Sequence, residues 1–203
     1  NQLFINRGVQ KGVPMFEDKT AEYGIGGEGS NSTQSAFFDY DKDGDLDMFL
    51  LNHGTMFYSP FINTDRLRSL RHPTFRNDQL NGKITFTEVS EAAGIKGGGN
   101  NFGLGVAISD VNNDGWPDIY VTNDYEEQDF LYCNNKDGTF KDITKEAVSH
   151  TSRFGMGVDI SDYNNDGLQD IVVLDMNPED NYRQKTLRGP DDFDKYQMLI
   201  SNG

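Results

Sequence analysis

The chain contains three copies of one acidic nonapeptide, D-x-[DN]-x-D-G-x-x-D, whose residue types and spacing suit a hard cation. The copies are Asp39–Asp47, Asp110–Asp118 and Asp162–Asp170, called here loops 1, 2 and 3. Calcium is bound by carboxylate, amide and carbonyl oxygens, and a Gly at position 6 permits the sharp turn that gathers them. We therefore predict about three bound Ca²⁺ ions, one in each loop.

The positions within a loop have different expected roles. Side-chain oxygens at positions 1, 3, 5 and 9 are expected to bind the ion directly, and position 7 through its backbone carbonyl. Asp45, at position 7 of loop 1, then carries a charge outside the direct ligands. The predicted metal residues are Asp39, Asp41, Asp43, Asp45, Asp47, Asp110, Asn112, Asp114, Trp116, Asp118, Asp162, Asn164, Asp166, Leu168 and Asp170.

Two simpler interpretations of these loops fit less well. A lone acidic turn is usually only solvated, but three copies in the same phase make that explanation poor. An EF-hand needs a Glu at position 12, where this chain has Leu50, Val121 and Val173. The loops are flanked by β-branched and aromatic runs, which predict strands on both sides. These runs are Ala36–Phe38, Val106–Ile108 and Val158–Ile160 before the loops, and MFLL, IYVTN and IVVLD after them.

The charge of the chain excludes one class of partner. A net charge of −15 and a pI near 4.4 argue against nucleic-acid binding, which requires a basic surface. The three loops hold eleven of the 33 acidic residues, and three calcium ions would raise the net charge to −9. Without metal, the carboxylates of each loop repel one another, so we expect apo loops to be disordered.

Other features of composition narrow the class of protein. The 203 residues suffice for one substantial core, and no apolar run approaches the length of a membrane span. The single cysteine, Cys133, excludes an intramolecular disulfide and is expected to be a small buried hydrophobe in a strand at Phe130–Asn134. Weak oxygen-only calcium loops fill most readily at extracellular calcium levels, which predicts an extracytoplasmic location: secreted, periplasmic or on the cell surface.

The acidic loop is one part of a longer repeat. A hydrophobic pair followed by Asn and a turn recurs at Asn6, Asn77, Asn134 and Asn202, at intervals of 71, 57 and 68 residues. A third element follows it, at Met15–Ile25, Thr85–Ile95 and Thr139–Val148. A period of this length with about four short strands matches a β-propeller blade better than a solenoid.

The unit resembles the FG-GAP/VCBS repeat of integrin-α-like β-propellers, and is most similar to the cartilage-acidic-protein-like group associated with ASPIC/UnbV domains. The resemblance covers nearly the whole chain and is carried by Phe102–Asp124, Leu131–Thr144 and Phe154–Lys185. It implies an all-β fold of four-stranded antiparallel propeller blades, with a calcium loop between the first two strands of each. The first copy departs from the pattern, because SAFFDYD replaces a Gly-rich strand.

The repeat also predicts an incomplete propeller. We expect residues 1–25 to end one blade, 33–95 and 102–148 to form two whole blades, and 154–203 to begin another. Closed propellers contain about 4–8 blades. The chain, which starts without Met or a signal peptide, is therefore expected to be a segment of a larger propeller of about 6–8 blades. Further sequence or other chains would complete it.

Two insertions are the predicted places for recognition. The first and third copies carry about 15 extra residues after the acidic loop, and long loops on a rigid scaffold commonly bind ligands. Residues 53–74 and 175–197 combine aromatic and cationic side chains, which suit a protein or an anionic glycan. The residue types favour the other interpretation, in which these side chains only pack on neighbouring blades or pair with nearby carboxylates.

The favoured interpretation is a non-catalytic, calcium-stabilised module for adhesion or ligand binding, without a membrane span. One alternative is the propeller of a polysaccharide lyase-like enzyme, with His53, Tyr58, Arg66 and His72 as candidate catalytic residues. Another is an architectural module of a larger surface complex. No His joins the acidic loops and no G-x-S-x-G motif is present, so the sequence favours the first interpretation.

Overall fold

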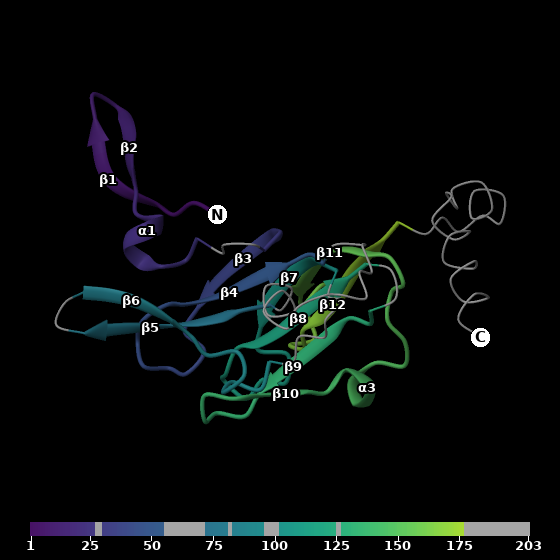
Figure 1. Ribbon diagram of the computed structural model, residues 1–203. Coiled ribbons are helices and arrows are strands. Elements are labelled where there is room, and N and C mark those ends of the chain that lie inside the picture. The colour runs from purple at the N-terminus through teal and green to yellow at the C-terminus, as the bar shows by residue number, and fades with distance from the viewer. Residues whose placement is uncertain (27–29, 55–71, 81–82, 96–101, 125–126, 177–203) are drawn as a thin grey trace, which may run out of the picture.

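Strands flank every acidic loop in the computed structural model, as the β-branched runs predict (Figure 1). The structure describes residues 1–26, 30–54, 72–80, 83–95, 102–124 and 127–176. The elements are β1 (Phe4–Gln10), β2 (Val13–Asp18), α1 (Thr20–Tyr23), β3 (Ser32–Phe38), β4 (Asp47–Asn52), β5 (Thr74–Leu80), β6 (Lys83–Glu88), β7 (Gly103–Ser109), β8 (Asp118–Asn123), β9 (Phe130–Asn134), β10 (Phe140–Asp142), α3 (Thr144–Ala147), β11 (Gly155–Ser161) and β12 (Asp170–Asp175).

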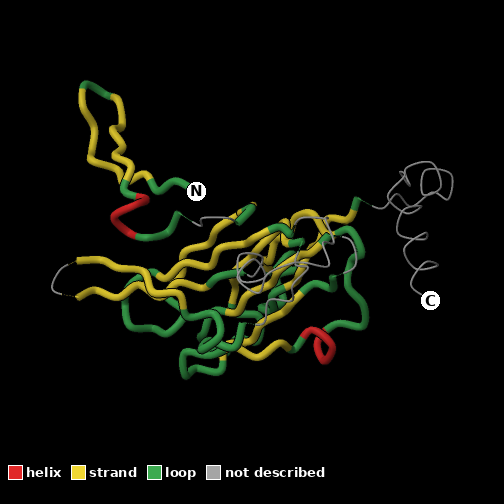
Figure 2. Tube along the Cα trace, viewed as in Figure 1, coloured by secondary structure: helices red, strands yellow, loops and turns green. Residues whose placement is uncertain are grey.

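The strands form antiparallel sheets that follow the chain order (Figure 2). Within the described residues, two sheets have four strands, in the orders β3-β4-β5-β6 and β7-β8-β9-β10, and two have two strands, β1-β2 and β11-β12. Each of loops 1, 2 and 3 connects the first strand of its sheet to the second: β3 to β4, β7 to β8 and β11 to β12. The all-β, antiparallel part of the predicted fold is therefore confirmed.

The first strands of three successive sheets lie next to one another. Strand β7 contacts β3 on one side and β11 on the other, so the sheets are neighbours through their first strands (Figure 1). The second strands β4 and β8 are buried along their whole length. The main core joins both four-stranded sheets and includes Phe49, Leu51, Ile119, Val121 and Tyr132.

The hairpin β1–β2 projects away from this core (Figure 1). Its apolar side chains Phe4, Val9 and Phe16 are more than half exposed. Strand β12 also exposes Val172 and Leu174, although the matching residues of β4 and β8 are buried. Among the described residues, no helix is long and apolar enough to cross a membrane.

A short turn follows each of the strands β2, β6 and β10. After β2 it contains α1, and after β10 it contains α3; neither helix was predicted from the sequence. A hydroxyl in this turn accepts a hydrogen bond from a backbone N–H at the start of the preceding strand pair, on the strand or just before it. The pairs are Thr20 Oγ1 with Leu3, Ser90 Oγ with Thr74, and Thr144 Oγ1 with Leu131. The recurring third element of the sequence therefore ties the end of a sheet to its third strand.

Candidate metal centre in the acidic loops

The three loops adopt one turn, in which the first aspartate accepts the N–H of the glycine at position 6. The Oδ2 to N distances are 3.1 Å for Asp39 and Gly44, 2.7 Å for Asp110 and Gly115, and 2.8 Å for Asp162 and Gly167. These glycines have φ between 87° and 98°, where an L side chain is strained. Position 4 is also left-handed in each loop, with φ of 57° to 60°.

The side chains at positions 3 and 5 bind the loop backbone in the same way. Position 3 accepts the N–H of position 5, with distances of 3.4, 2.9 and 2.9 Å in loops 1, 2 and 3. Position 5 accepts the N–H of position 7, with distances of 3.1, 2.9 and 2.8 Å. Oxygens from positions 1, 3 and 5 are thereby turned toward the inside of one short loop. This arrangement suits a hard cation.

Loop 1 brings three carboxylates together. One oxygen from each of Asp39, Asp41 and Asp43 lies within 4.8 Å of the other two. In loops 2 and 3 the Oδ1 of the first aspartate accepts the N–H of position 5, whereas Asp39 Oδ1 is buried without a hydrogen-bond partner. An unpartnered buried carboxylate oxygen is costly and is stabilised by a cation. The residues of loop 1 therefore fit the predicted metal.

The electrostatics of loop 1 agree with this fit. Burial, and then the charge of Asp43, raise the pKa of Asp41 above its ordinary value. The same two causes raise the pKa of Asp45. Asp45 Oδ1 is buried and has no partner, so this residue is partly enclosed and is not the freely solvated charge that its position suggests. Crowded carboxylates disfavour ionisation unless a cation neutralises them.

The aspartate at position 9 is held differently from the other predicted ligands. Asp47 and Asp118 are fully buried, and each accepts two backbone N–H groups. One donor is position 2 of the same loop, at 3.2 Å in loop 1 and 3.0 Å in loop 2; the other is the repeat asparagine on the third strand, Asn77 or Asn134, at 2.8 Å in both. Burial raises the pKa of Asp47 to about 7. These carboxylates fasten the loop to the sheet, a role that the sequence did not indicate.

The repeat asparagine completes this fastening. Asn77 Nδ2 donates to the carbonyl of Leu46 at 3.1 Å, and Asn134 Nδ2 to the carbonyl of Pro117 at 3.3 Å; both carbonyls are at position 8 of a loop. Asn134 Nδ2 also donates to the carbonyl of Tyr40, in loop 1, at 2.8 Å. The recurrence of Asn in phase with the loops was the sequence signal for this role.

The residue before the repeat asparagine faces position 3 of the loop. In the second sheet it is Cys133, whose Sγ receives a hydrogen bond from Asn112 Nδ2 at 3.2 Å. The thiol is half-buried, so the expectation of a simple buried hydrophobe is wrong. Burial, and then the nearby Asp118, raise the pKa of the Cys133 thiol. In the first sheet the same position is Arg76, which pairs with Asp78 at 2.9 Å.

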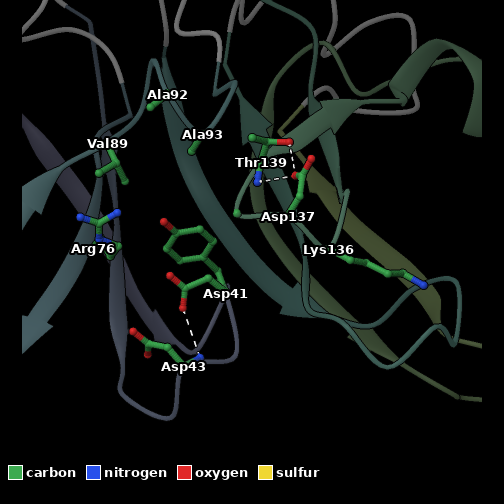
Figure 3. A pocket seen from close by; sticks show the side chains of 11 residues that line it. Asp41, Asp43, Arg76, Val89, Ala92, Ala93, Lys136, Asp137 and Thr139 are labelled. Atoms are coloured by element: carbon green, nitrogen blue, oxygen red, sulfur yellow. Dashed lines mark hydrogen bonds between the residues drawn. The ribbon is translucent and has the colours of Figure 1, made fainter.

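A cleft of about 470 Å³ opens beside loop 1, between the two four-stranded sheets (Figure 3). Asp41, Asp43 and Arg76 line one side, and Lys136 and Asp137 line the other. Its cations are already engaged: Arg76 by the carboxylate noted above, and Lys136 by an Asp114 oxygen at 3.3 Å. Both cations of the cleft are therefore already paired with carboxylates that do not line it.

The candidate catalytic residues are not gathered into an active site in the described part of the chain. His72 is fully buried, and its Nδ1 accepts the N–H of Asn52 at 3.1 Å. Burial lowers the pKa of His72 to about 3, against a smaller opposing effect of Asn123. His53 packs on Phe102, with ring centroids 5.3 Å apart. Tyr58, Arg66 and most of the two insertions, residues 53–74 and 175–197, lie outside the described residues.

Comparisons with known proteins find local similarity. Residues 110–173 match the family described as FG-GAP-like repeat. The chain is 37% identical over 76 residues to Cartilage acidic protein 1 of Xenopus tropicalis, covering 37% of this chain and 12% of that protein. It is 31% identical over 115 residues to Cartilage acidic protein 1 of Homo sapiens, covering 56% and 17%. Similarity to Integrin alpha-3 of Mus musculus is 34% over 86 residues, covering 37% and 8%.

Each of these relatives is much longer than the present sequence. The chain spans between 8% and 17% of their lengths.

Proposed function

We propose that the chain, whose residues 110–173 match the FG-GAP-like repeat family, is a calcium-stabilised β-propeller segment that takes part in ligand binding or adhesion without catalysis. The observation that carries the proposal is the common geometry of loops 1, 2 and 3. In each, the side chains at positions 1, 3 and 5 accept backbone N–H groups of the same loop. In loop 1 one oxygen from each lies within 4.8 Å of the other two, and a buried Asp39 oxygen lacks a partner. A divalent cation bound by these side chains would neutralise the carboxylates and hold the turn.

The propeller is supported by the order and placement of the sheets. Two four-stranded antiparallel sheets follow one another, and their first strands lie side by side with that of a third sheet. We assign β3–β6 and β7–β10 as blades, β1–β2 as the outer half of one blade and β11–β12 as the inner half of another. The remaining blades would come from further sequence or from other chains, giving about 6–8 in all.

The binding role is supported by the relatives, and its ligand is a separate proposal. We assign recognition of a protein or an anionic glycan to residues 53–74 and 175–197, whose aromatic and cationic side chains suit such ligands. An extracytoplasmic location agrees with weak calcium loops, which fill at millimolar calcium. The metal is assigned a structural role, because all its candidate ligands in a site belong to one loop and none is a His.

Calorimetric titration with Ca²⁺ and thermal denaturation in calcium or chelator test this proposal. We expect about three ions to bind, and each site at 100-fold excess over its Kd to add about 2.7 kcal/mol to the free energy of unfolding. The double variant Asp39→Asn/Asp43→Asn should bind one ion fewer. Its control, Glu91→Gln/Glu146→Gln, removes the same charge from exposed residues outside the loops and should bind the full number. Unchanged melting temperature in millimolar calcium would overturn the proposal.

A further inference from the structure

The three acidic loops touch one another through the residue at position 4. Lys42, at position 4 of loop 1, places its Nζ 4.8 Å from the ring centroid of Trp116 in loop 2. The same Nζ lies 3.8 Å from where a Cβ on Gly115 would be. Asn113, at position 4 of loop 2, donates from Nδ2 to the carbonyl of Gly167 in loop 3 at 3.0 Å. In both pairs, position 4 reaches position 6 or 7 of the next loop.

The receiving part of each loop is also the part that holds candidate ligands. The N–H of Gly167 is bound by Asp162 at 2.8 Å, and the next N–H, of Leu168, is bound by Asp166 at 2.8 Å. The carbonyl that Asn113 contacts belongs to the same peptide unit as the Leu168 N–H and to the same residue as the Gly167 N–H. A cation that fixes Asp162 and Asp166 therefore also fixes the acceptor of Asn113.

We propose that the cation sites are thermodynamically coupled from loop to loop, and that Lys42 and Asn113 are the positioning residues that couple them. The inference rests on the proposed cation binding. A cation in one loop orders the contact that the neighbouring loop must otherwise order itself, so the second ion binds at lower entropic cost. The coupling is reciprocal, because linkage between two binding equilibria is symmetric.

Electrostatics act in the opposite sense and set the conditions of the test. A bound cation weakens the negative potential at the neighbouring loop, which lowers the affinity there. Salt at about 0.15 M reduces this effect, with a screening length of about 8 Å, while a hydrogen bond is much less affected. The measurement is therefore made at that ionic strength.

The chain contains an internal probe for loop 2, because Trp116 is its only tryptophan. Terbium luminescence excited through Trp116 reports occupancy of loop 2, and displacement by Ca²⁺ gives its calcium affinity. The test compares the full chain with Asp162→Asn/Asp166→Asn, which disables loop 3, and with Asn113→Gly, which keeps the left-handed backbone but removes the amide. Asn165→Gly is the matched control at position 4 of loop 3. The Asn165 side chain forms no hydrogen bond to another loop in the described part of the chain.

We expect disabling loop 3 to weaken calcium binding in loop 2 by about two- to tenfold, the range that one hydrogen bond supports. Asn113→Gly should give the same loss, the two changes should not add, and Asn165→Gly should leave loop 2 unchanged. Lys42→Gly should likewise uncouple loop 2 from an Asp39→Asn/Asp43→Asn change in loop 1. Loop 2 affinity that is independent of loop 3, or equal in Asn113→Gly and Asn165→Gly, would overturn the coupling alone. No terbium signal in any variant would overturn both the cation sites and their coupling.

Discussion

At the scale of single residues, the two four-stranded sheets use different side chains to accept the same backbone N–H group. The N–H at the end of the second strand is bound by His72 Nδ1 in the first sheet and by Asp129 Oδ1, at 2.9 Å, in the second. Both acceptors are fully buried and lie one or two residues before the third strand. The Asp129 carboxylate also accepts the Tyr120 hydroxyl at 3.0 Å. The position therefore requires a buried acceptor, and a neutral imidazole is sufficient.

The buried imidazole makes folding dependent on pH. Burial lowers the pKa of His72 from 6.5 to about 3, so between these values the unfolded chain binds a proton that the folded chain does not. The His72 contribution to stability is complete above pH 6.5 and is lost as pH falls toward 3. Asn at this position would keep an acceptor that does not titrate.

Through His72, the wild-type protein should lose about 3 kcal/mol of its free energy of unfolding between about pH 6.5 and pH 4. We expect this part of the loss to be absent in His72→Asn. The measurement is urea unfolding at both pH values, and exposed His150→Asn is the control. An equal loss in wild type and His72→Asn would show that the pKa of His72 is not lowered in the folded protein.

Two left-handed glycines differ in what surrounds them. Gly94 has φ of 73°, and a Cβ there would lie 2.7 Å from the carbonyl oxygen of Phe140, whose N–H binds the Ala93 carbonyl at 2.8 Å. Gly138 has φ of 81° and open space around it. The first glycine therefore permits close contact between the two four-stranded sheets, and the second only a turn.

We expect Gly138→Ala to cost about 1–2 kcal/mol from backbone strain alone. Gly94→Ala should cost about 2 kcal/mol more, because the methyl group must displace β10. Chemical denaturation of both variants compares them directly. An equal loss of stability in Gly94→Ala and Gly138→Ala would mean that the two sheets can move apart at Gly94 without loss of stability.

At the scale of elements, the third strand supports two loops at once. Asn134 on β9 is buried and joins carbonyls from loops 1 and 2, while its Oδ1 accepts the N–H of Lys136 at 2.8 Å. A β-strand residue thus connects parts of the chain up to 94 residues apart. Truncation at this position leaves several buried polar groups without partners.

We expect Asn134→Ala to lower the free energy of unfolding by about 2–4 kcal/mol, since each orphaned buried group costs about 1–3 kcal/mol. It should also weaken cation binding directly in loops 1 and 2, and in loop 3 only through the coupling to loop 2, so that loop 3 loses the least affinity. The neighbouring Asn135→Ala, at an exposed residue, serves as control. Relative to the wild-type protein, an equal loss of calcium affinity in all three loops of Asn134→Ala would contradict this account.

The elements show where sequence reasoning succeeds and where it stops. The strands around the loops were predictable, because β-branched residues and a strict acidic pattern are local signals. The hydrogen bond from Asn134 to the Tyr40 carbonyl could not be predicted, because no local sequence pattern indicates a contact between two sheets. The role of Asp118 as a buried hydrogen-bond acceptor could not be predicted for a different reason. An aspartate suits a metal ligand and a hydrogen-bond acceptor equally well, so the residue type does not distinguish the two roles.

At the scale of the whole molecule, neighbouring sheets contact each other in two ways, through closely packed glycines and through a side-chain amide. Between β7 and β11 the contact is close, and a Cβ on Gly105 would lie 3.1 Å from the Cα of Gly157. Between β3 and β7, Gln34 occupies the glycine position, and its amide binds both the N–H and the carbonyl of Val106, at 3.0 and 3.2 Å. The Gly-poor first copy, a departure in the sequence, is therefore a polar version of the same contact.

The fastening of loops 1 and 2 to third strands predicts an order of events during folding. The Asp47 bond closes a segment of 30 residues, whereas the Asp118 bond closes one of 16. Closing the longer segment costs about 0.6 kcal/mol more in chain entropy. The second sheet should therefore form first and act as the surface on which the first sheet assembles. Pulse-labelling hydrogen exchange during refolding should find the Asn134 amide protected before that of Asn77, and the reverse order would show that the insertion does not delay closure.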